Sequence, residues 1–402
     1  MTPNSDTKQG GLRRLLLGQV PADFADWLDF VAIGATLAFT WAVGAPVFAI
    51  LAVSMGLPYL LIGPFAGAFV DRCDTRTVLI WSNVGRAVAT AALCVAPDWP
   101  TLMVVITIRS CIDTFFTPAK QSAIQALTTR PTRTRANALS HGINQTSKII
   151  APAMGGALLI WISPQMIFAL NAVVSLLAAA IYVGLHALPP APQAGDGPGA
   201  VGSFAQIRSG LSDVSQSFAL KSAIGLMAGG YFAMFFYDTL IAPLTRDLGF
   251  DPILFGYALA AVGAGGVLGS AGMTLIGDAV RPFLTVAAAS ALAGLITIGI
   301  GVTEMSGIAP SLPVFLSAWG GLGVMAALSV IPFRTVMQTH CPERSIGQIT
   351  ALSEAVNTVA LLTAPFIGAL VAAAFSIGAA FVLGGSVMLV VGLAAFGLRR
   401  VV

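Results

Sequence analysis

Long apolar runs separated by short polar clusters recur along almost the whole chain of 402 residues. A helix that crosses a bilayer needs about 20 predominantly apolar residues. By that length criterion we expect helices at 16–41, 46–70, 77–96, 101–125, 136–161, 165–188, 221–245, 252–277, 282–303, 311–335, 346–371 and 375–398. The pattern therefore predicts an all-α polytopic membrane protein with twelve transmembrane helices.

A polar stretch rich in proline and glycine, beginning at Pro189, separates the first six predicted helices from the last six. Such a composition favours a flexible linker. The residues at 203–218 are weakly amphipathic, and we expect them to lie along the membrane surface. We predict an N-terminal six-helix bundle over 1–188, a cytoplasmic linker over 189–218 and a C-terminal six-helix bundle over 219–402.

A partial internal repeat supports this division. Several residues of the predicted helix at 136–161 recur 213 positions later in the helix at 346–371: Ala138-Leu139-Ser140, Asn144, Ala151-Pro152 and Gly155 match Ala351-Leu352-Ser353, Asn357, Ala364-Pro365 and Gly368. The match includes Ser, Asn and Pro, which is less easily reached by chance than a match of apolar letters. Two pseudo-symmetric bundles with a binding site between them are a known transporter plan.

The composition excludes several classes of protein. Hydrophobic residues make up 56% of the chain and charged residues only 9%, against about 25% charged in soluble domains. The net charge of +3 is small and the basic residues are scattered along the chain, which argues against nucleic-acid binding. The four cysteines lack the spacing of metal ligands. With no nucleotide-binding loop and no nucleophile–base pair, an enzyme is not expected, and neither is a cofactor.

The basic residues predict the orientation, because cytoplasmic loops of membrane proteins are enriched in Lys and Arg. With a cytoplasmic N-terminus, sixteen basic residues fall on the cytoplasmic side and one, Arg246, on the other. The sixteen are Lys8, Arg13, Arg14, Arg72, Arg76, Lys120, Arg130, Arg133, Arg135, Arg208, Lys221, Arg281, Arg334, Arg344, Arg399 and Arg400. We therefore expect both termini and the central linker in the cytoplasm.

The loop between the second and third predicted helices carries a recognisable motif, Gly67-Ala68-Phe69-Val70-Asp71-Arg72-Cys73-Asp74-Thr75-Arg76. It resembles the signature loop of the major facilitator superfamily, Gly-x-x-x-Asp-Arg-x-Gly-Arg-Arg/Lys, and departs from it at Asp74 and Thr75. Three further elements, Ala25-Asp26-Trp27, Phe115-Phe116-Thr117-Pro118-Ala119 and Arg135-Ala136-Asn137-Ala138-Leu139, resemble a bacterial efflux branch that includes macrolide and multidrug efflux pumps and the enterobactin (siderophore) exporter.

The resemblance implies the superfamily fold, with two six-helix bundles around a central cavity, in the inner (cytoplasmic) membrane of a bacterium. It also implies a conformational latch formed by Gly67, Asp71, Arg72, Asp74 and Arg76, which holds the two halves together in the outward-facing state. The alternative for these loop charges is ordinary solvation. Asp71→Asn is expected to cripple transport while leaving membrane insertion intact.

Three aspartates, Asp23, Asp26 and Asp29, interrupt the first apolar run. Each costs about 2.5–3.5 kcal/mol at the centre of a membrane helix, so they require water, a cationic partner or a proton. Their spacing places them on one face of a helix. We expect Asp23 near the cytoplasmic rim, as a cavity residue or a structural interfacial one, and Asp26 and Asp29 at cavity depth.

The predicted fourth helix carries Arg109 and, one turn further, Asp113 on the same face. The first and fourth helices line the cavity in the superfamily, so we predict that Arg109 pairs with Asp26, Asp29 or Asp113. Pairing with a cation lowers the pKa of a carboxylate, whereas burial raises it. A carboxylate under both influences can load and release a proton. These four residues are the predicted proton-coupling site. The alternative is a static ion-pair network.

Other polar residues inside the predicted helices are ascribed to the substrate cavity or to support. Arg86 is expected to support the acids of the first helix or the signature loop. Asn144 is placed at the cavity, and Lys148 either faces it or extends towards the headgroups. Tyr237 and Asp238 lie in an aromatic segment that suits an amphipathic or cationic substrate, although such aromatics also occur as lipid-facing residues.

Small residues mark the fifth predicted helix. Pro152, Gly155 and Gly156 resemble a helix-packing motif associated with antiporters, and Pro365 and Gly368 repeat part of it in the second half. Small residues let helix backbones approach closely.

The sequence thus predicts a monomeric, proton-coupled secondary active exporter of amphipathic small molecules, such as drugs or a siderophore, working by alternating access. Protons are the expected coupling ion, and membrane lipid and the small-molecule substrate are the expected partners. A lysophospholipid flippase on the same fold is the alternative. A non-transporting sensor is disfavoured by the intramembrane charges, and import instead of export stays open.

Overall fold

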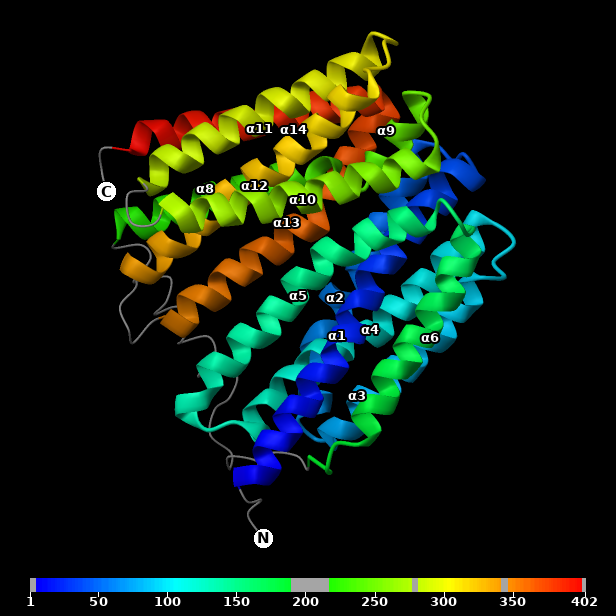
Figure 1. Ribbon diagram of the computed structural model, residues 1–402, viewed down its shortest axis with the longest axis vertical. Coiled ribbons are helices and arrows are strands. Elements are labelled where there is room, and N and C mark those ends of the chain that lie inside the picture. Colours follow the sequence, from blue (N-terminus) through cyan, green and yellow to red (C-terminus); the bar gives the residue numbers. More distant parts are fainter. Residues whose placement is uncertain (1–4, 189–216, 277–280, 341–345, 400–402) are drawn as a thin grey trace. The chain divides into compact units, whose positions relative to one another are not determined.

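The computed structural model describes residues 5–188, 217–276, 281–340 and 346–399. Every element within these ranges is a helix (Figure 1). The first half contains α1 (Ser5–Ala35), the π-helical turn η1 (Thr36–Thr40), α2 (Ala45–Val70), α3 (Thr75–Leu93), α4 (Trp99–Leu127), α5 (Arg130–Leu158) and α6 (Pro164–Val183). The second half contains α8 (Phe218–Asp238), α9 (Ile241–Asp247), α10 (Pro252–Ile276), α11 (Pro282–Met305), α12 (Leu312–His340), α13 (Ile346–Ala374) and α14 (Ile377–Leu398).

Twelve long helices in the described ranges therefore occupy the twelve predicted positions, and the all-α, multi-span prediction is confirmed. Eight of them are long and apolar enough to cross a membrane: α2, α4, α6, α8, α10, α11, α12 and α14. Large apolar side chains such as Trp81, Trp161 and Leu275 are exposed. Exposed apolar surface of this kind suits contact with lipid.

Several helix boundaries differ from the prediction, with the largest differences at the helix expected at 221–245 and at the start of α1. The helix expected at 221–245 is broken, because α8 ends at Asp238 and α9 begins at Ile241. Pro243 lies in the first turn of α9, a position that tolerates proline. Near the N-terminus, α1 begins at Ser5, well before the predicted span at 16–41. The amphipathic stretch predicted at 203–218 lies outside the described residues except for its last two.

Polar residues at several helix starts accept hydrogen bonds from the first turn. Asp98, Ser163, Ser217 and Ser376 each accept one from the backbone N–H three residues later. These caps satisfy N–H groups that have no partner inside the helix. Hydrogen bonds from the side chain and backbone of Thr101 also lower the pKa of the Asp98 carboxyl.

The chain divides into two compact units, Met1–Val43 with Val53–Ala194, and Gly44–Ala52 with Gly195–Val402. In the first unit α1 packs against α4, α5 and α6, and α3 packs against α4 and α6. In the second unit α8 packs against α12, α13 and α14, and α11 packs against α12 and α14. The second list repeats the first helix for helix, so these contacts are equivalent in the two units. The second unit also has a close contact between α10 and α12, whereas the described residues of the first unit show no comparable contact between α2 and α4.

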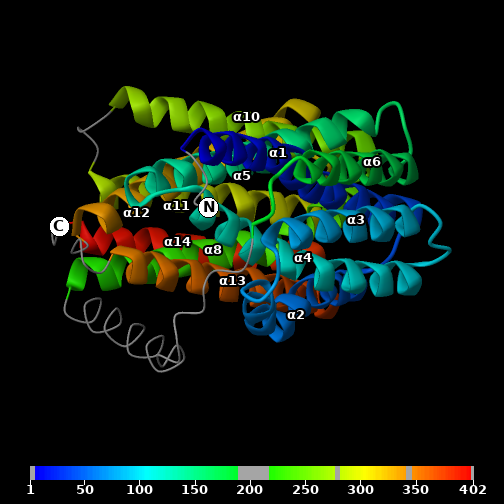
Figure 2. The same cartoon turned by 90° about the horizontal axis from the view of Figure 1, so that it is seen from below.

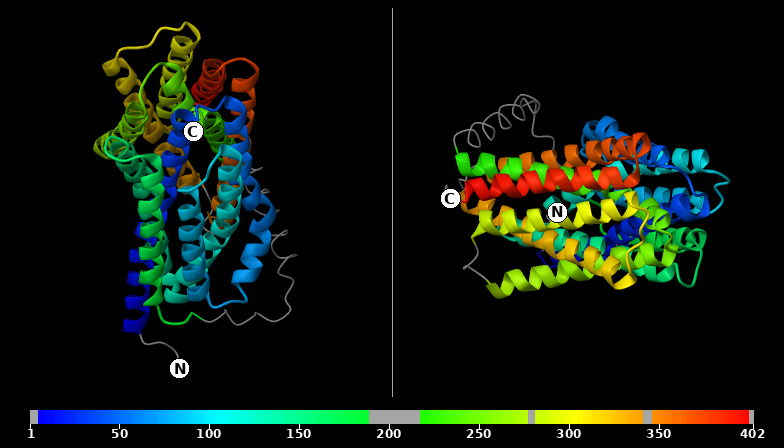
Figure 3. Two further views of the ribbon diagram at one scale, coloured as in Figure 1. Left: turned by 90° about the vertical axis from the view of Figure 1, so that its right-hand side faces the viewer. Right: turned by 90° about the horizontal axis from the view of Figure 1, so that it is seen from above.

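The long helices of each unit run alongside one another (Figures 2 and 3). The exact domain boundaries predicted above, 1–188, 189–218 and 219–402, stay a prediction, because the connecting residues lie outside the described ranges.

The repeated glycine lies at a helix contact in both units. A Cβ atom at Gly155 of α5 would lie 3.0 Å from Leu28 Cδ1 of α1. A Cβ at the matching Gly368 of α13 would collide with the backbone carbonyl oxygen of Phe236 in α8. Pro152, Gly156 and Pro365 are buried beside them. The predicted close helix packing at this motif is therefore observed at equivalent helix pairs.

Gly368→Ala should destabilise the second unit, because backbone at Phe236 cannot move aside without shifting a helix. Overpacking of this kind costs about 1–3 kcal/mol, so the thermal unfolding midpoint in detergent should fall by several degrees. Gly230→Ala in α8 is the matched control, since a Cβ there meets nothing within 4 Å. Equal midpoints for the two variants would contradict the packing described here.

Candidate functional site

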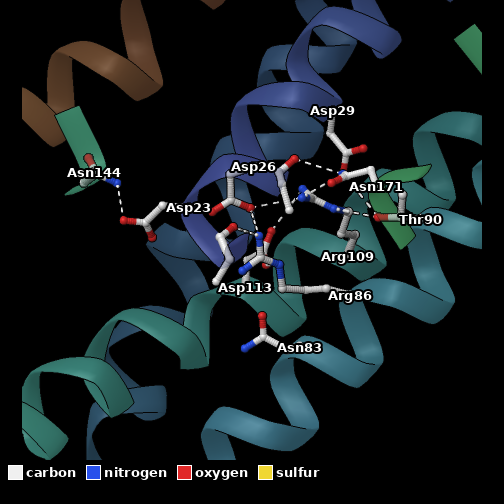
Figure 4. Close-up of polar contacts among 12 residues, drawn as sticks. Asp23, Asp26, Asp29, Asn83, Arg86, Thr90, Arg109, Asp113, Asn144 and Asn171 are labelled. Carbon is white, nitrogen blue, oxygen red and sulfur yellow. Dashed lines mark hydrogen bonds and ion pairs between the residues drawn. The ribbon is translucent and has the colours of Figure 1, made fainter. Parts of the chain in front are cut away.

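The polar face of α1 points into a cluster of charged side chains from α3 and α4 (Figure 4). We use the name charge cluster for Asp26, Asp29, Arg86, Arg109 and Asp113. All five belong to the first unit. The side chain of Asp26 is 38% exposed, whereas those of the other four are buried. Asp26 is therefore the open edge of the charge cluster.

Arg109 of α4 contacts all three carboxylates of the charge cluster. Its Nη2 lies 3.1 Å from Asp26 Oδ1 and 2.8 Å from Asp29 Oδ2, and its Nη1 lies 3.1 Å from Asp113 Oδ2. The predicted pairing of Arg109 is therefore confirmed, with three partners instead of one. A guanidinium can serve several acceptors because it presents five N–H donors in a plane.

Arg86 of α3 is the second cation of the charge cluster and has no exposed surface. It forms an ion pair with Asp26 Oδ1, and its Nε lies 2.8 Å from Asp113 Oδ1. Its Nη2 also donates to the backbone carbonyl of Ala22 at 3.0 Å. Of the two supporting roles predicted for Arg86, the structure places it with the acids of α1. Asp26 Oδ1 is thus shared by both guanidinium groups.

Neutral side chains around the charge cluster form hydrogen bonds with its members and with the backbone of α1. Thr90 Oγ1 donates to Asp29 Oδ2 at 3.2 Å and accepts from Arg109 Nε at 3.3 Å. Asn171 of α6 donates to the Ala25 carbonyl at 2.9 Å. Sequence reasoning missed both residues. The spacing of Asn83, Arg86 and Thr90 along one buried face of α3 was the available signal.

Tyr59 of α2 is a further residue that the sequence reasoning missed. It interacts electrostatically with Asp26, Asp113 and both arginines of the charge cluster, and it is 40% exposed. Gly63 lies one turn further on the same face of α2. A Cβ atom at this position would lie 3.9 Å from Thr114 Cγ2 of α4. Tyr59 and Asp26 are the two partly exposed residues at the edge of the charge cluster.

The negative and positive charges of the charge cluster are unequal in number when every group is ionised. Three carboxylates face two guanidinium groups, which leaves one negative charge. An unbalanced charge is costly in a low-dielectric interior. Asp29 is buried, and the side chains that hydrogen-bond to its carboxyl, Thr90 and Asn171, are neutral and add no positive charge. The arrangement can therefore accommodate one proton or one cationic group, with Asp26 as its accessible member.

Asp23 belongs to a separate network, and its predicted position near the cytoplasmic rim stays a prediction. Its side chain is 2% exposed, with Lys120 Nζ of α4 3.5 Å from Oδ1. Gln19 and Asn144 donate to Oδ2 at 2.7 Å and 3.2 Å, and Gln19 exchanges hydrogen bonds with Ser140 of α5. One carboxylate and one ammonium group leave this Asp23 network neutral. Lys120, assigned above to the cytoplasmic flank, lies buried inside α4 instead.

The remaining predicted cavity residues are dispersed. The Lys148 ammonium group of α5 lies 4.9 Å from the centre of the Trp27 ring, within range of a cation–π contact. Tyr237 is only 6% exposed, and its ring centre is 4.8 Å from that of Phe381 in the second unit. Its assignment to the cavity is corrected, because it is packed in an aromatic core. Asp238 beside it is partly buried.

The signature-loop residues divide into two groups. Gly67 lies in the last turn of α2, and Asp71 and Arg72 are exposed and form no ion pair with another described side chain. Arg76 instead donates to the Val183 carbonyl at the end of α6, and Asp74 accepts from the backbone N–H of Leu188, which follows α6. The latch stays a prediction. Among the described residues, no group of three His, Cys, Asp or Glu side chains is arranged to hold a metal ion.

Comparison with known proteins agrees with the fold. The chain resembles a solved bacterial homologue of the human lysosomal transporter Spinster, in an inward-facing and unoccupied conformation, with a TM-score of 0.71. The match covers 99% of this chain and 96% of that one at 14% identity. At such identity the likeness concerns the fold alone.

Three curated relatives also match. An uncharacterised MFS-type transporter, YfiS of Bacillus subtilis, is 27% identical over 96% of this chain and 92% of its own. Macrolide efflux protein A of Streptococcus pyogenes is 24% identical over 83% and 82%. Enterobactin exporter EntS of Escherichia coli is 24% identical over 79% and 74%.

The family model described as Major Facilitator Superfamily matches residues 15–360, which is most of the chain. This match spans both the charge cluster and the signature loop. The resemblance noted from the sequence motifs is therefore confirmed, and the protein is a multi-pass membrane transporter, not an enzyme. The chain belongs to the major facilitator superfamily.

Proposed function

We propose that the protein is a proton-coupled antiporter that exports amphipathic small molecules by alternating access. The observation that carries the proposal is the charge cluster, in which three carboxylates meet two buried guanidinium groups on α1, α3 and α4. Intramembrane ionisable residues of transporters commonly mark ion pathways and proton relays.

The charge balance supports a single proton per cycle. A proton on Asp26 leaves Asp29 and Asp113 as the two carboxylates that face Arg86 and Arg109, so the charge cluster becomes neutral. We assign this role to Asp26, because it is the most exposed member and therefore the one that a proton from water can reach. Protonation removes the ion pairs that join Asp26 to α3 and α4. The Asp29–Arg109 pair still holds α1 in place.

The direction and substrate class are supported by the relatives. Two of them carry names that describe export, of macrolides and of enterobactin. Their identity to this chain is 24%, so the proposal extends to amphipathic small molecules as a class. We further propose a monomer in the inner membrane of a bacterium, with both termini in the cytoplasm, as the distribution of Lys and Arg indicates.

The test is transport by the purified protein in proteoliposomes with an imposed pH gradient. A macrolide, a siderophore and a lysophospholipid are offered in parallel. The proposal expects accumulation of the macrolide or the siderophore that depends on the pH gradient and collapses with a protonophore. Movement of the lysolipid alone, with no need for a gradient, would replace the proposal with a flippase.

Asp26→Asn should abolish uphill transport driven by the pH gradient, at least tenfold below wild type, because the amide cannot carry the proton. Exchange of labelled for unlabelled substrate at equal concentrations should persist, since it needs no net proton movement. Asp29→Asn should lower uphill transport as well, because the charge cluster is then neutral without a proton. Asp98→Asn is the control, because Asp98 is exposed and Asn is also a good helix cap. Wild-type uphill transport in both Asp26→Asn and Asp29→Asn would contradict the coupling role.

The Asp23 network should contribute to stability and not to coupling. Lys120→Met leaves Asp23 buried without its cation, and breaking a buried pair costs about 3–5 kcal/mol. The thermal unfolding midpoint should fall markedly in this variant. The double variant with Asp23→Asn should recover most of the loss, because neither charge remains unpaired. A double variant that is no more stable than Lys120→Met would contradict this assignment.

A further inference from the structure

The segment that follows α6, Gly184–Leu188, is the last described part of the chain before the connection between the two units. Polar side chains from α1 and α3 bind its backbone at several points. These contacts lie wholly within the first unit and involve none of the residues of the charge cluster.

Asp74 makes the central contact. Its Oδ1 accepts a hydrogen bond from the Leu188 backbone N–H at 2.7 Å, and its Oδ2 accepts one from Thr77 Oγ1 at 2.8 Å. The Thr75 backbone N–H donates in return to the Leu188 carbonyl at 3.0 Å. Both backbone polar groups of Leu188 are therefore bound to the start of α3.

The physical basis is the unsatisfied N-terminus of α3. The first N–H groups of a helix have no partner within it, and here Leu188 supplies the acceptor for Thr75. A carboxylate beside a helix N-terminus is also stabilised by the helix dipole. Asp74 precedes α3 as its N-cap residue but makes no capping bond to its own helix. Its carboxylate holds Leu188 instead.

Two arginines bind the preceding residues. Arg76 Nη2 donates to the Val183 carbonyl at 2.6 Å, and Arg14 of α1 donates to the Gly184 carbonyl. These carbonyls belong to the end of α6, where helix acceptors lack partners and cations are favoured. The side chains of Leu185 and Leu188 are buried in the same hydrophobic cluster as Leu79 of α3. Polar and apolar contacts thus act on the same five-residue segment.

We propose that Asp74, with Arg76 and Arg14, anchors the start of the inter-unit connection to α1 and α3. The anchor fixes Gly184–Leu188 to the starts of α1 and α3, so this segment moves together with the first unit during transport. Asp74 and Arg76 are then positioning residues for alternating access. Asp74 is the position at which this chain departs from the glycine of the signature loop, and the anchor gives that departure a role.

This inference depends on membership of the transporter superfamily and not on the proposed proton coupling or substrate class. Asp71 supplies a matched comparison for the contact itself, because it is an exposed carboxylate in the same loop with no described ion-pair partner. Asp74→Asn keeps the size of the side chain but replaces one acceptor oxygen with a donor. It should lose one of the two hydrogen bonds that Asp74 accepts.

The direct test is hydrogen–deuterium exchange of the purified full-length protein in detergent. In Asp74→Ala, amide exchange in peptides covering Gly184–Leu188 should rise at least tenfold, while peptides of α4 stay unchanged. Asp71→Ala should leave exchange in Gly184–Leu188 as in wild type. If Asp74→Ala does not fold, Asp74→Asn and Thr77→Val provide the same comparison with smaller expected increases. Wild-type exchange in the folded Asp74 variant, or an equal increase in Asp71→Ala, would overturn the anchor.

A second readout separates positioning from mere stability. In proteoliposomes, the folded Asp74 variant should show a maximum transport rate several-fold below wild type with an unchanged KM, because the substrate site is intact. Asp251→Asn, an exposed change in the second unit, should leave the maximum rate unchanged. A raised KM with an unchanged maximum rate would overturn the positioning role. Because the exchange measurement needs no substrate, its result stands apart from the outcome of the transport proposal.

Discussion

The ion pairing of three carboxylates with two buried guanidinium groups is the interaction on which the first unit depends. Arg86 and Arg109 come from different helices, and each binds at least two carboxylates, so α1, α3 and α4 are joined through shared acceptors. Removing a partner from such a cluster leaves a charge uncompensated in a low-dielectric region, which is costly. The same property makes the cluster responsive, because one added positive charge rebalances it.

Two networks on one helix face have different consequences. The Asp23 network pairs one acid with one base and satisfies its carboxylate with Gln19 and Asn144. The charge cluster retains one excess negative charge and an exposed edge at Asp26. A balanced, buried pair favours a fixed structure, whereas an unbalanced cluster with access favours exchange of a proton. The distinction follows from charge count and burial, not from residue type.

Much of the fold and part of the site could be predicted from the sequence. Apolar runs located the twelve long helices of the described ranges, because lipid imposes a length on each span. The pairing of Arg109 with the acids of α1 is predictable from the family resemblance, which places the first and fourth helices at one cavity. The burial of Asp23 could not be predicted, because its partner Lys120 lies near the end of a predicted helix and was assigned to the cytoplasmic side. The role of Asp74 was also out of reach, because it depends on the path that the backbone takes after α6.

The central claim is that the charge cluster holds one exchangeable proton and that Asp26 carries it. Infrared difference spectroscopy of the purified protein between acidic and alkaline conditions reports the protonation of carboxyl groups directly. The account predicts one such carboxyl band in the wild-type protein, absent from Asp26→Asn and retained in Asp98→Asn. A wild-type spectrum with no protonated carboxyl under any of these conditions, or a band that persists unchanged in Asp26→Asn, would contradict it.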